Sequence, residues 1–322
     1  MKLIRRRRLL EIVSACAASV AFPLATRAQG AYPTKPIKLT VPYAAGSNAD
    51  QVARLITPKW AEILGQPVVI ENRVGAGGTI GAAYLAKTAP DGYNLLLGNA
   101  PTHTSGPAWQ KVPYDPVADF VPISRLVSSD YTLAVGPALP VKSVSDLVAY
   151  IRKQPRDISY ASLGDGTGVH LSALGLARAL GVELKQVPYS SNGPALVDVS
   201  TGTVTMIFYP YPPMAGMVQS GKLRVLASTG ARRAVATPEL PTMIESGVNY
   251  SETSWHGLFA PQGVPREVID TLYTTLMKAM ADPSVIAGMR PTGVGLDPLS
   301  PAQFADFVKS QAAFYRALHS KG

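Results

Sequence analysis

Short runs of β-branched and leucine residues alternate with helical stretches along most of the chain, and this alternation constrains the fold more than any other feature. Residues 37–41 read as a strand, residues 48–64 as a helix and residues 68–71 as a second strand. A strand followed by a helix and a further strand is the repeating unit of sheets that helices cover on both faces. The sequence therefore predicts an α/β protein.

The same alternation continues to about residue 227. Residues 95–97 are all leucine, and so continuous an apolar run suits a strand that is buried on both faces. Ser143 is placed to cap a helix over residues 143–154. Further strands are expected at residues 132–135, 158–161, 184–187, 205–208 and 223–227, and further helices at residues 79–87, 168–181 and 195–200. The C-terminal portion is expected to be mainly helical, with helix starts at Pro265 and at the capping box of residues 300–303.

The first 28 residues are expected to be a signal peptide. Lys2 and residues 5–8 (four arginines) are basic, residues 9–24 are mostly apolar, and residues 26–28 (Thr-Arg-Ala) place small side chains where signal peptidase requires them. The apolar stretch is too short and too interrupted to span a bilayer. We therefore expect export to the periplasm and a mature chain that begins near Gln29. The arginine run also matches a twin-arginine pattern, so the sequence leaves the Sec and the Tat pathways open.

Cys16 is the only cysteine of the chain, and it lies inside this leader. Residues 13–16 loosely resemble a lipoprotein cleavage box, which leaves lipidation at Cys16 as an alternative. The apolar stretch continues well past Cys16, so we expect a mature protein without a lipid and without cysteine. Its fold then depends on its hydrophobic core and not on disulfides.

The leader also accounts for much of the positive charge. Residues 1–28 hold six of the 30 Lys and Arg residues and one of the 21 Asp and Glu residues, which leaves 24 basic and 20 acidic residues in the mature chain. No basic run remains, and this argues against nucleic acid as a partner.

About 294 residues follow the leader, enough for two domains of ordinary size. The pattern breaks near residues 128–130, and the C-terminal helices are expected to carry no further paired strands. We expect residues 31–130 plus 254–322 to form domain 1 and residues 131–253 to form domain 2, joined by chain crossovers.

Four turns that lead from a strand into a helix are rich in Gly, Ser and Asn. Glycine lets a backbone approach a ligand closely, and the start of a helix offers unpaired N–H groups to an anion. One such turn would be an ordinary connection. Four turns divided between two α/β halves favour a ligand between the halves, at the carboxyl ends of the strands. The turns are residues 45–48, 75–79, 164–168 and 190–193.

The sequence contains no established catalytic motif. Residues 75–81 lack the G-x-G-x-x-G spacing, and the chain has neither a P-loop nor a G-x-S-x-G elbow. The four histidines stand far apart, so no zinc pattern is present. We expect a protein that is not an enzyme and that carries no cofactor and no metal.

Segments spread in order over the mature chain resemble the Bug-type extracytoplasmic solute receptors of tripartite tricarboxylate transporters. The segments are residues 32–37 (YPTKPI), 41–46 (VPYAAG), 50–54 (DQVAR), 71–78 (ENRVGAGG), 90–93 (PDGY), 113–116 (PYDP), 119–123 (DFVPI), 221–224 (GKLR), 240–242 (LPT) and 255–261 (WHGLFAP).

This resemblance implies a two-domain Venus-flytrap fold of the type II periplasmic binding class. It also implies a receptor that holds a small carboxylate in the interdomain cleft, through backbone amides, hydroxyls and water, for delivery to the permease subunits of the transporter. Two positions depart from the family: Ser47 replaces a frequent glycine, and residues 190–191 (Ser-Ser) replace a common Lys-Gly. The ligand of a relative therefore cannot be transferred. A receptor that signals to a membrane kinase, or a secreted hydrolase using the same cleft, remain the alternatives.

The candidate ligand contacts combine the resemblance with the four turns. They are Tyr43, Ala45, Gly46, Ser47, Asn48, Asp50, Gly78, Thr79, Asn99, Thr102, His103, Ser162, Gly164, Thr167, His170, Tyr189 and Asn192. Asp50 is also open to a structural role in the first turn of its helix. The turns contain neither Lys nor Arg, so we expect an organic anion held without an arginine. An amino acid would need an acceptor for its ammonium group, and only Asp50 and Asp165 stand near the turns.

Overall fold

The computed structural model describes residues 32–154, 158–234, 237–289, 292 and 294–320. The chain divides into two units, residues 1–34 and residues 35–322. The described part of the first unit is Tyr32 to Thr34, with a cis peptide bond between Tyr32 and Pro33. The expected signal peptide, its cleavage site and Cys16 lie outside the described residues. All elements named below belong to the second unit.

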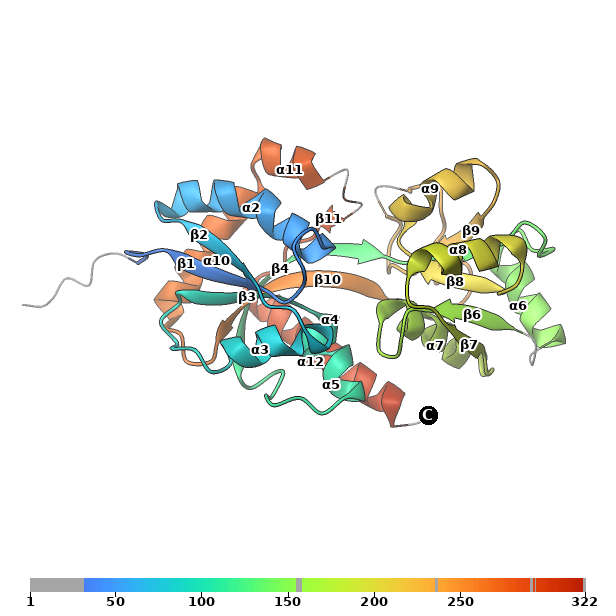
Figure 1. Cartoon of the computed structure of the whole chain (residues 1–322), viewed down its shortest axis with the longest axis horizontal. Coiled ribbons are helices and arrows are strands. Elements are labelled where there is room, and N and C mark those ends of the chain that lie inside the picture. Colours follow the sequence, from blue (N-terminus) through green and yellow to red (C-terminus); the bar gives the residue numbers. More distant parts are fainter. Residues whose placement is uncertain (1–31, 155–157, 235–236, 290–291, 293, 321–322) are drawn as a thin grey trace, which may run out of the picture. The chain divides into compact units, whose positions relative to one another are not determined.

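The first sheet contains six strands in the order β11-β4-β10-β3-β1-β2. Strand β1 runs parallel to β2 and β3, whereas β10 is antiparallel to both β3 and β4 (Figure 1). The leucines of β3 are fully buried, as their continuous apolar run predicts. The strands are β1 (Ile37–Val41), β2 (Val68–Asn72), β3 (Asn94–Asn99), β4 (Phe120–Asp130), β10 (Thr253–Pro261) and β11 (Gly295–Leu296).

Helices cover both faces of this sheet (Figure 1). Helix α2 (Asn48–Leu64) packs against α10 (Arg266–Met280) and α11 (Pro283–Met289). The buried Trp60 donates its indole N–H to Thr275 of α10 at 3.0 Å. The other face is covered by η1 (Ala76–Gly78), α3 (Thr79–Leu85), α4 (Ala100–His103), α5 (Ser105–Trp109) and α12 (Pro301–His319).

The second sheet contains five strands in the order β7-β6-β8-β5-β9. Strand β6 is parallel to β7 and β8, and β5 is antiparallel to β8 and β9. The strands are β5 (Thr132–Val135), β6 (Ser159–Ser162), β7 (Lys185–Pro188), β8 (Met206–Tyr209) and β9 (Arg224–Ser228). Its helices are α6 (Val144–Lys153), α7 (Gly168–Leu180), α8 (Asn192–Thr201) and α9 (Tyr211–Gln219).

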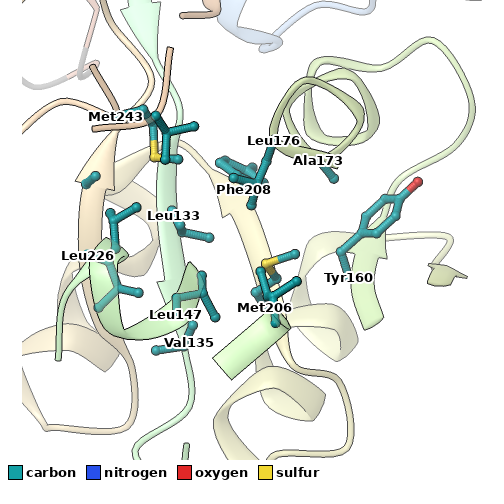
Figure 2. Packing of buried hydrophobic residues seen from close by; sticks show 14 of the residues in the cluster. Leu133, Val135, Leu147, Tyr160, Ala173, Leu176, Met206, Phe208, Leu226 and Met243 are labelled. Carbon is teal, nitrogen blue, oxygen red and sulfur yellow. The ribbon is translucent and has the colours of Figure 1, made fainter. Parts of the chain in front are cut away.

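The period of two along β5 and β8 divides the core of this sheet into two layers. Leu133 and Phe208 face a cluster with Leu147 and Leu176 from α6 and α7 (Figure 2). Their neighbours Ala134 and Ile207 point to the opposite face, against α8 and α9. Both faces are buried because helices cover each of them.

The chain passes between the two sheets twice, from β4 to β5 through Tyr131 and from β9 to β10 through residues 229–252. The first sheet draws its strands from residues 37–130 and 253–296, and the second from residues 132–228. The domain boundaries themselves stay a prediction.

The expectation that the C-terminal part adds no paired strand is wrong. Strand β10 lies between β3 and β4, and β11 pairs with β4. The sequence pattern missed β10 because glycine, proline and three aromatic or imidazole side chains interrupt the aliphatic run that marks the other strands.

The expected local signals are confirmed at several helix starts. Ser143 caps α6 by accepting from Asp146 N, and Ser300 and Gln303 form the reciprocal capping box of α12. Pro265 is the cap residue of α10, one position before the one that we expected. None of the helices in the part of the chain that the structure describes combines the length with the hydropathy that a membrane span requires.

Candidate functional site

A cavity of about 290 Å³ lies where the carboxyl ends of β1 and β3 meet the beginning of β10. Strands of the first sheet, the segments that connect the two sheets, and helix α7 beside the second sheet contribute to its wall. The lining residues are Tyr43, Ser47, Asn48, Ala49, Asn99, Ala100, Pro101, Ser105, Tyr131, Gly168, Leu171, Glu252, Ser254 and His256.

The first turn of α2 forms one part of this wall. Ser47 caps the helix, and its hydroxyl accepts from Asp50 N at 3.3 Å. Asn48 and Ala49 follow as the first two helical residues, and both line the cavity. The N–H groups of these two positions have no partner within a helix, so this turn presents hydrogen-bond donors and the positive end of the helix dipole.

Asp50 holds this turn together and does not line the cavity. Its buried carboxylate accepts from Gly46 N at 2.8 Å, from Asn72 Nδ2 at 3.0 Å and from Arg54 Nε at 2.8 Å. These donors, Arg54 first, lower the pKa of Asp50 to about 2. Of the two roles open to Asp50, the geometry therefore favours the structural one.

Tyr43 and Asn99 form a hydrogen-bonded pair in the wall. The Tyr43 hydroxyl donates to Asn99 Oδ1 at 3.0 Å, or accepts from Asn99 Nδ2 at 2.8 Å. Burial raises the pKa of Tyr43 to about 12, so its hydroxyl keeps its proton. Gly78 lies behind Tyr43 with a φ of +96°, and a Cβ at this position would lie 2.8 Å from Thr102 Cγ2. A glycine here lets the wall pack closely.

Thr102 and His103 lie one layer behind Asn99. Thr102 Oγ1 accepts from Asn99 N at 2.8 Å and also lies 2.8 Å from His103 Nδ1. The His103 ring stacks on Phe259 with 3.7 Å between ring centroids. Burial lowers the pKa of His103 to about 3, so the ring is neutral at physiological pH. Both residues position the wall and do not line the cavity.

The start of α7 forms a second donor-bearing part of the wall. Gly168 is the first residue of this helix, and a Cβ added there would overlap the Tyr131 hydroxyl. The missing side chain therefore lets Tyr131 rest against the first turn of α7. Leu171, one turn further on, also lines the cavity.

Four predicted residues support this turn from behind without lining the cavity. Thr167 caps α7 by accepting from His170 N, and His170 Nδ1 accepts from Gly166 N at 3.1 Å. Ser162 Oγ accepts from Gly164 N at 3.2 Å. These bonds fix the loop before α7, because its polar groups satisfy one another and leave the first helical residue free to face the cavity.

The remaining predicted residues lie elsewhere. Ala45 and Gly46 are exposed in the loop before α2, and the Thr79 hydroxyl donates to Ala76 O at 2.9 Å. The Tyr189 hydroxyl donates to Asp198 Oδ2 at 2.6 Å, and Asn192 begins α8. None of the five lines the cavity, and the turn at residues 190–193 contributes no lining residue.

Sequence reasoning missed the contribution of β10. Glu252, which directly precedes this strand, and Ser254 and His256 at its beginning alternate along the chain and line the cavity together. His256 pairs with Asn99 on the neighbouring strand β3. The signal that could have found them is this period-two spacing of polar residues, beside a tryptophan that is buried.

The electrostatics of the cavity are set by Glu252 and His256. Burial raises the pKa of Glu252 to about 7, against the opposing effect of a hydrogen bond from Tyr315. Burial lowers the pKa of His256 to about 4, so its ring is neutral at pH 7. Among the lining residues that the structure describes, Glu252 is the only Asp, Glu, Lys or Arg.

Two buried polar side chains of the wall lack hydrogen-bond partners among the described residues. They are the Ser105 hydroxyl and Nδ1 of His256. An unpaired polar group that is buried destabilises a fold by about 1–3 kcal/mol, so such groups mark places where a ligand or water completes the bonding. As for metals, the described ranges hold no cluster of His, Cys, Asp and Glu that could bind one.

Solved structures with the same architecture place the chain in a class of proteins. The periplasmic binding protein BugD is 35% identical, with a TM-score of 0.70, and the match covers 90% of this chain and 98% of that one. MatC from Rhodopseudomonas palustris, solved with bound malate, is 30% identical with a TM-score of 0.71, covering 89% and 100% of the two chains. A second R. palustris protein, solved with adipate, is 33% identical with a TM-score of 0.73, covering 90% and 97%.

The two-sheet fold and the cavity between strand ends therefore define a periplasmic solute-binding protein, and this confirms the fold class that the sequence predicts. The family model described as the tripartite tricarboxylate transporter family receptor matches residues 52–320. The chain belongs to this family, and the resemblance found in the sequence is confirmed.

Proposed function

We propose that this receptor captures a small organic carboxylate in the cavity and delivers it to the permease subunits of a tripartite tricarboxylate transporter. The observation that carries the proposal is the presence of two helix starts, those of α2 and α7, in the wall of one cavity. N–H groups at such positions bind carboxylates without a basic side chain.

The ligands of two relatives support this chemistry. Malate and adipate, which the R. palustris proteins bind, are both small dicarboxylates. Among the predicted contacts, Tyr43, Ser47, Asn48 and Asn99 line the cavity, and we propose these four as ligand contacts. Residues 131–253 would move against residues 31–130 plus 254–322 when the ligand binds, with the chain crossings beside Tyr131 and Glu252 as the hinge.

Binding without chemistry is the second part of the proposal. In the described part of the chain, no hydrogen bond joins a lining serine to His256, and this supports a role in binding over one in catalysis. The receptor would act in the periplasm after its signal peptide is removed at residue 28. No cofactor and no nucleic acid enters this function.

Calorimetry with mono-, di- and tricarboxylates, aromatic acids, amino acids and neutral sugars tests the proposal. We expect saturable binding of at least one carboxylate and none of the sugars. Saturable binding of a sugar with every carboxylate inactive would overturn the proposal.

A charge placed at the start of α2 sharpens this test. Asn48→Asp adds a carboxylate at the first helical position, where it suits the helix dipole but repels an anionic ligand. We expect unchanged or higher thermal stability and at least tenfold weaker binding. Ala45→Asp, which adds the same charge at an exposed position of the same loop, is the matched control and should bind nearly normally. Equal affinities of the two variants would show that the ligand is not bound at α2.

A further inference from the structure

Glu252 occupies a fixed place in the cavity wall. Its backbone N–H donates to Thr229 O at 2.8 Å, and the Thr229 hydroxyl donates back to Glu252 O at 2.6 Å. The residue is 5% exposed and directly precedes β10. Because both backbone groups are held, the side chain starts from a defined position beside Tyr131 and Ser254, which line the same cavity.

The carboxyl group of Glu252 is only half satisfied by the protein. The Tyr315 hydroxyl of α12 donates to Oε1 at 2.5 Å. No described residue donates to Oε2, and no ion pair of the described chain includes Glu252. The nearest ionisable groups that influence it, Tyr131, Tyr250 and Tyr315, are phenols whose pKa burial raises, so none of them supplies a positive charge.

A buried carboxyl group without a cation or a full set of donors is unfavourable. Proteins keep such a group where a ligand completes its bonding. A plain dicarboxylate would bring a second negative charge to this wall and no donor. A carboxylic acid that also carries an ammonium or a hydroxyl group would offer Oε2 the donor that it lacks.

We propose that Glu252 determines specificity, accepting a hydrogen bond from an ammonium or hydroxyl group of the ligand while the N–H groups of α2 and α7 bind the ligand carboxylate. This rests on the proposed function, because it requires a carboxylate in the cavity. It also changes the expectation from the sequence, where only Asp50 and Asp165 were considered as acceptors. Asp50 already accepts from Gly46, Arg54 and Asn72, and Asp165 is exposed.

Three acids of one carbon skeleton test the proposal: succinate, malate and aspartate, which differ only in carrying hydrogen, hydroxyl or ammonium at one carbon. Propionate, lactate and alanine repeat the comparison at a shorter length. In calorimetry with the wild-type protein, we expect a donor-bearing acid to bind at least tenfold more tightly than its plain counterpart, as a hydrogen bond to a charged group requires. Preference for the amino acid over the hydroxy acid identifies an ammonium ligand, and the reverse order identifies a hydroxyl ligand.

Glu252→Gln keeps the size of the side chain and its acceptor for Tyr315 but removes the charge. We expect this variant to reduce the preference to about threefold or less. Glu183→Gln, the same charge change at an exposed position, should leave the preference intact. Tyr315→Phe removes the hydroxyl that donates to Glu252, and the preference for donor-bearing acids should then stay the same or increase.

The outcomes separate this inference from the function on which it rests. If succinate and propionate bind the wild-type protein as tightly as their donor-bearing counterparts, the role of Glu252 is overturned while carboxylate capture stands. An unchanged preference in Glu252→Gln overturns it as well. If neither series nor any other carboxylate binds, the proposed function fails. The wild-type comparison decides the question even if Glu252→Gln does not fold.

Discussion

Asp50 offers the sharpest test of how the α2 turn is built. Asp50→Asn keeps the shape of the side chain but removes the charge that accepts from Gly46, Asn72 and Arg54. The pKa of Asp50 falls from 3.8 to about 2 in the folded protein. At about 1.4 kcal/mol for each pKa unit, this corresponds to about 2.5 kcal/mol as an upper value.

Solvent reduces this figure. The Arg54 side chain is 56% exposed, so its share is screened, and an asparagine retains one acceptor for Gly46 or Asn72. We expect Asp50→Asn to lower the free energy of unfolding by about 1–2 kcal/mol at neutral pH. Binding should weaken too, because the loop that presents Asn48 loses its anchor.

The pH dependence has a defined sign. The folded-state pKa lies below the unfolded-state value, so the stabilisation is complete above about pH 4 and is lost as the pH falls towards 2. Urea unfolding of wild type and Asp50→Asn at neutral pH and near pH 3 should therefore show a gap that narrows in acid. Asp146→Asn, in the exposed first turn of α6, is the matched control and should cost less. Equal stability of wild type and Asp50→Asn at neutral pH would refute this reasoning.

Three further predictions concern the core, the buried acid and the leader. Leu133→Ala should lower the free energy of unfolding in urea by about 2–5 kcal/mol, because Leu133 is fully buried in the cluster of Figure 2, whereas Val197→Ala at a half-exposed site should stay within about 0.5 kcal/mol. The folded-state pKa of Glu252 is raised from 4.5 to about 7, so its contribution to stability decreases as the pH rises through this range. Glu252→Gln should therefore flatten this part of the curve of Tm against pH. A variant curve that runs parallel to the wild-type curve would contradict the prediction. Intact-mass analysis of the exported protein should show a chain that starts near Gln29 with no lipid, and a diacylglyceryl group on Cys16 would contradict it.

Local sequence signals predicted most elements because those signals act over short distances. The hydrophobic runs of β1 and β5 and the Ser143 cap depend on residues a few positions apart, and the structure places them where the pattern does. The sequence pattern did not predict strand β10, because its burial comes from both neighbouring strands and from Phe304 of α12, against which Gly257 packs. A glycine that is required by close packing resembles a turn when it is read alone.

The candidate site divides in the same way. Tyr43, Ser47, Asn48 and Asn99 lie at or shortly beyond the carboxyl ends of β1 and β3. The rule that ligands bind at such ends, together with the family resemblance, predicted them as candidate contacts, and the structure places all four in the cavity wall. In the sequence, His103 and His170 are equally plausible ligand contacts. In the structure both rings face inward: His103 contacts Thr102 and stacks on Phe259, and His170 accepts a hydrogen bond from Gly166. The direction of a side chain around a turn is a tertiary property.

The sequence by itself determined the α/β class and the family, since both depend on periodicity or on short segments in a fixed order, and it predicted the start of α2 as a place for an anion. Tertiary structure alone decided that Gly168 and Tyr131 meet, that Asn72 of β2 helps to satisfy the Asp50 carboxylate, and that Glu252, which lies outside every predicted turn, reaches the cavity. The physical reason is that β10 returns from the end of the second sheet to lie between β3 and β4, and this pairing joins residues more than 120 positions apart. No local pattern encodes that distance.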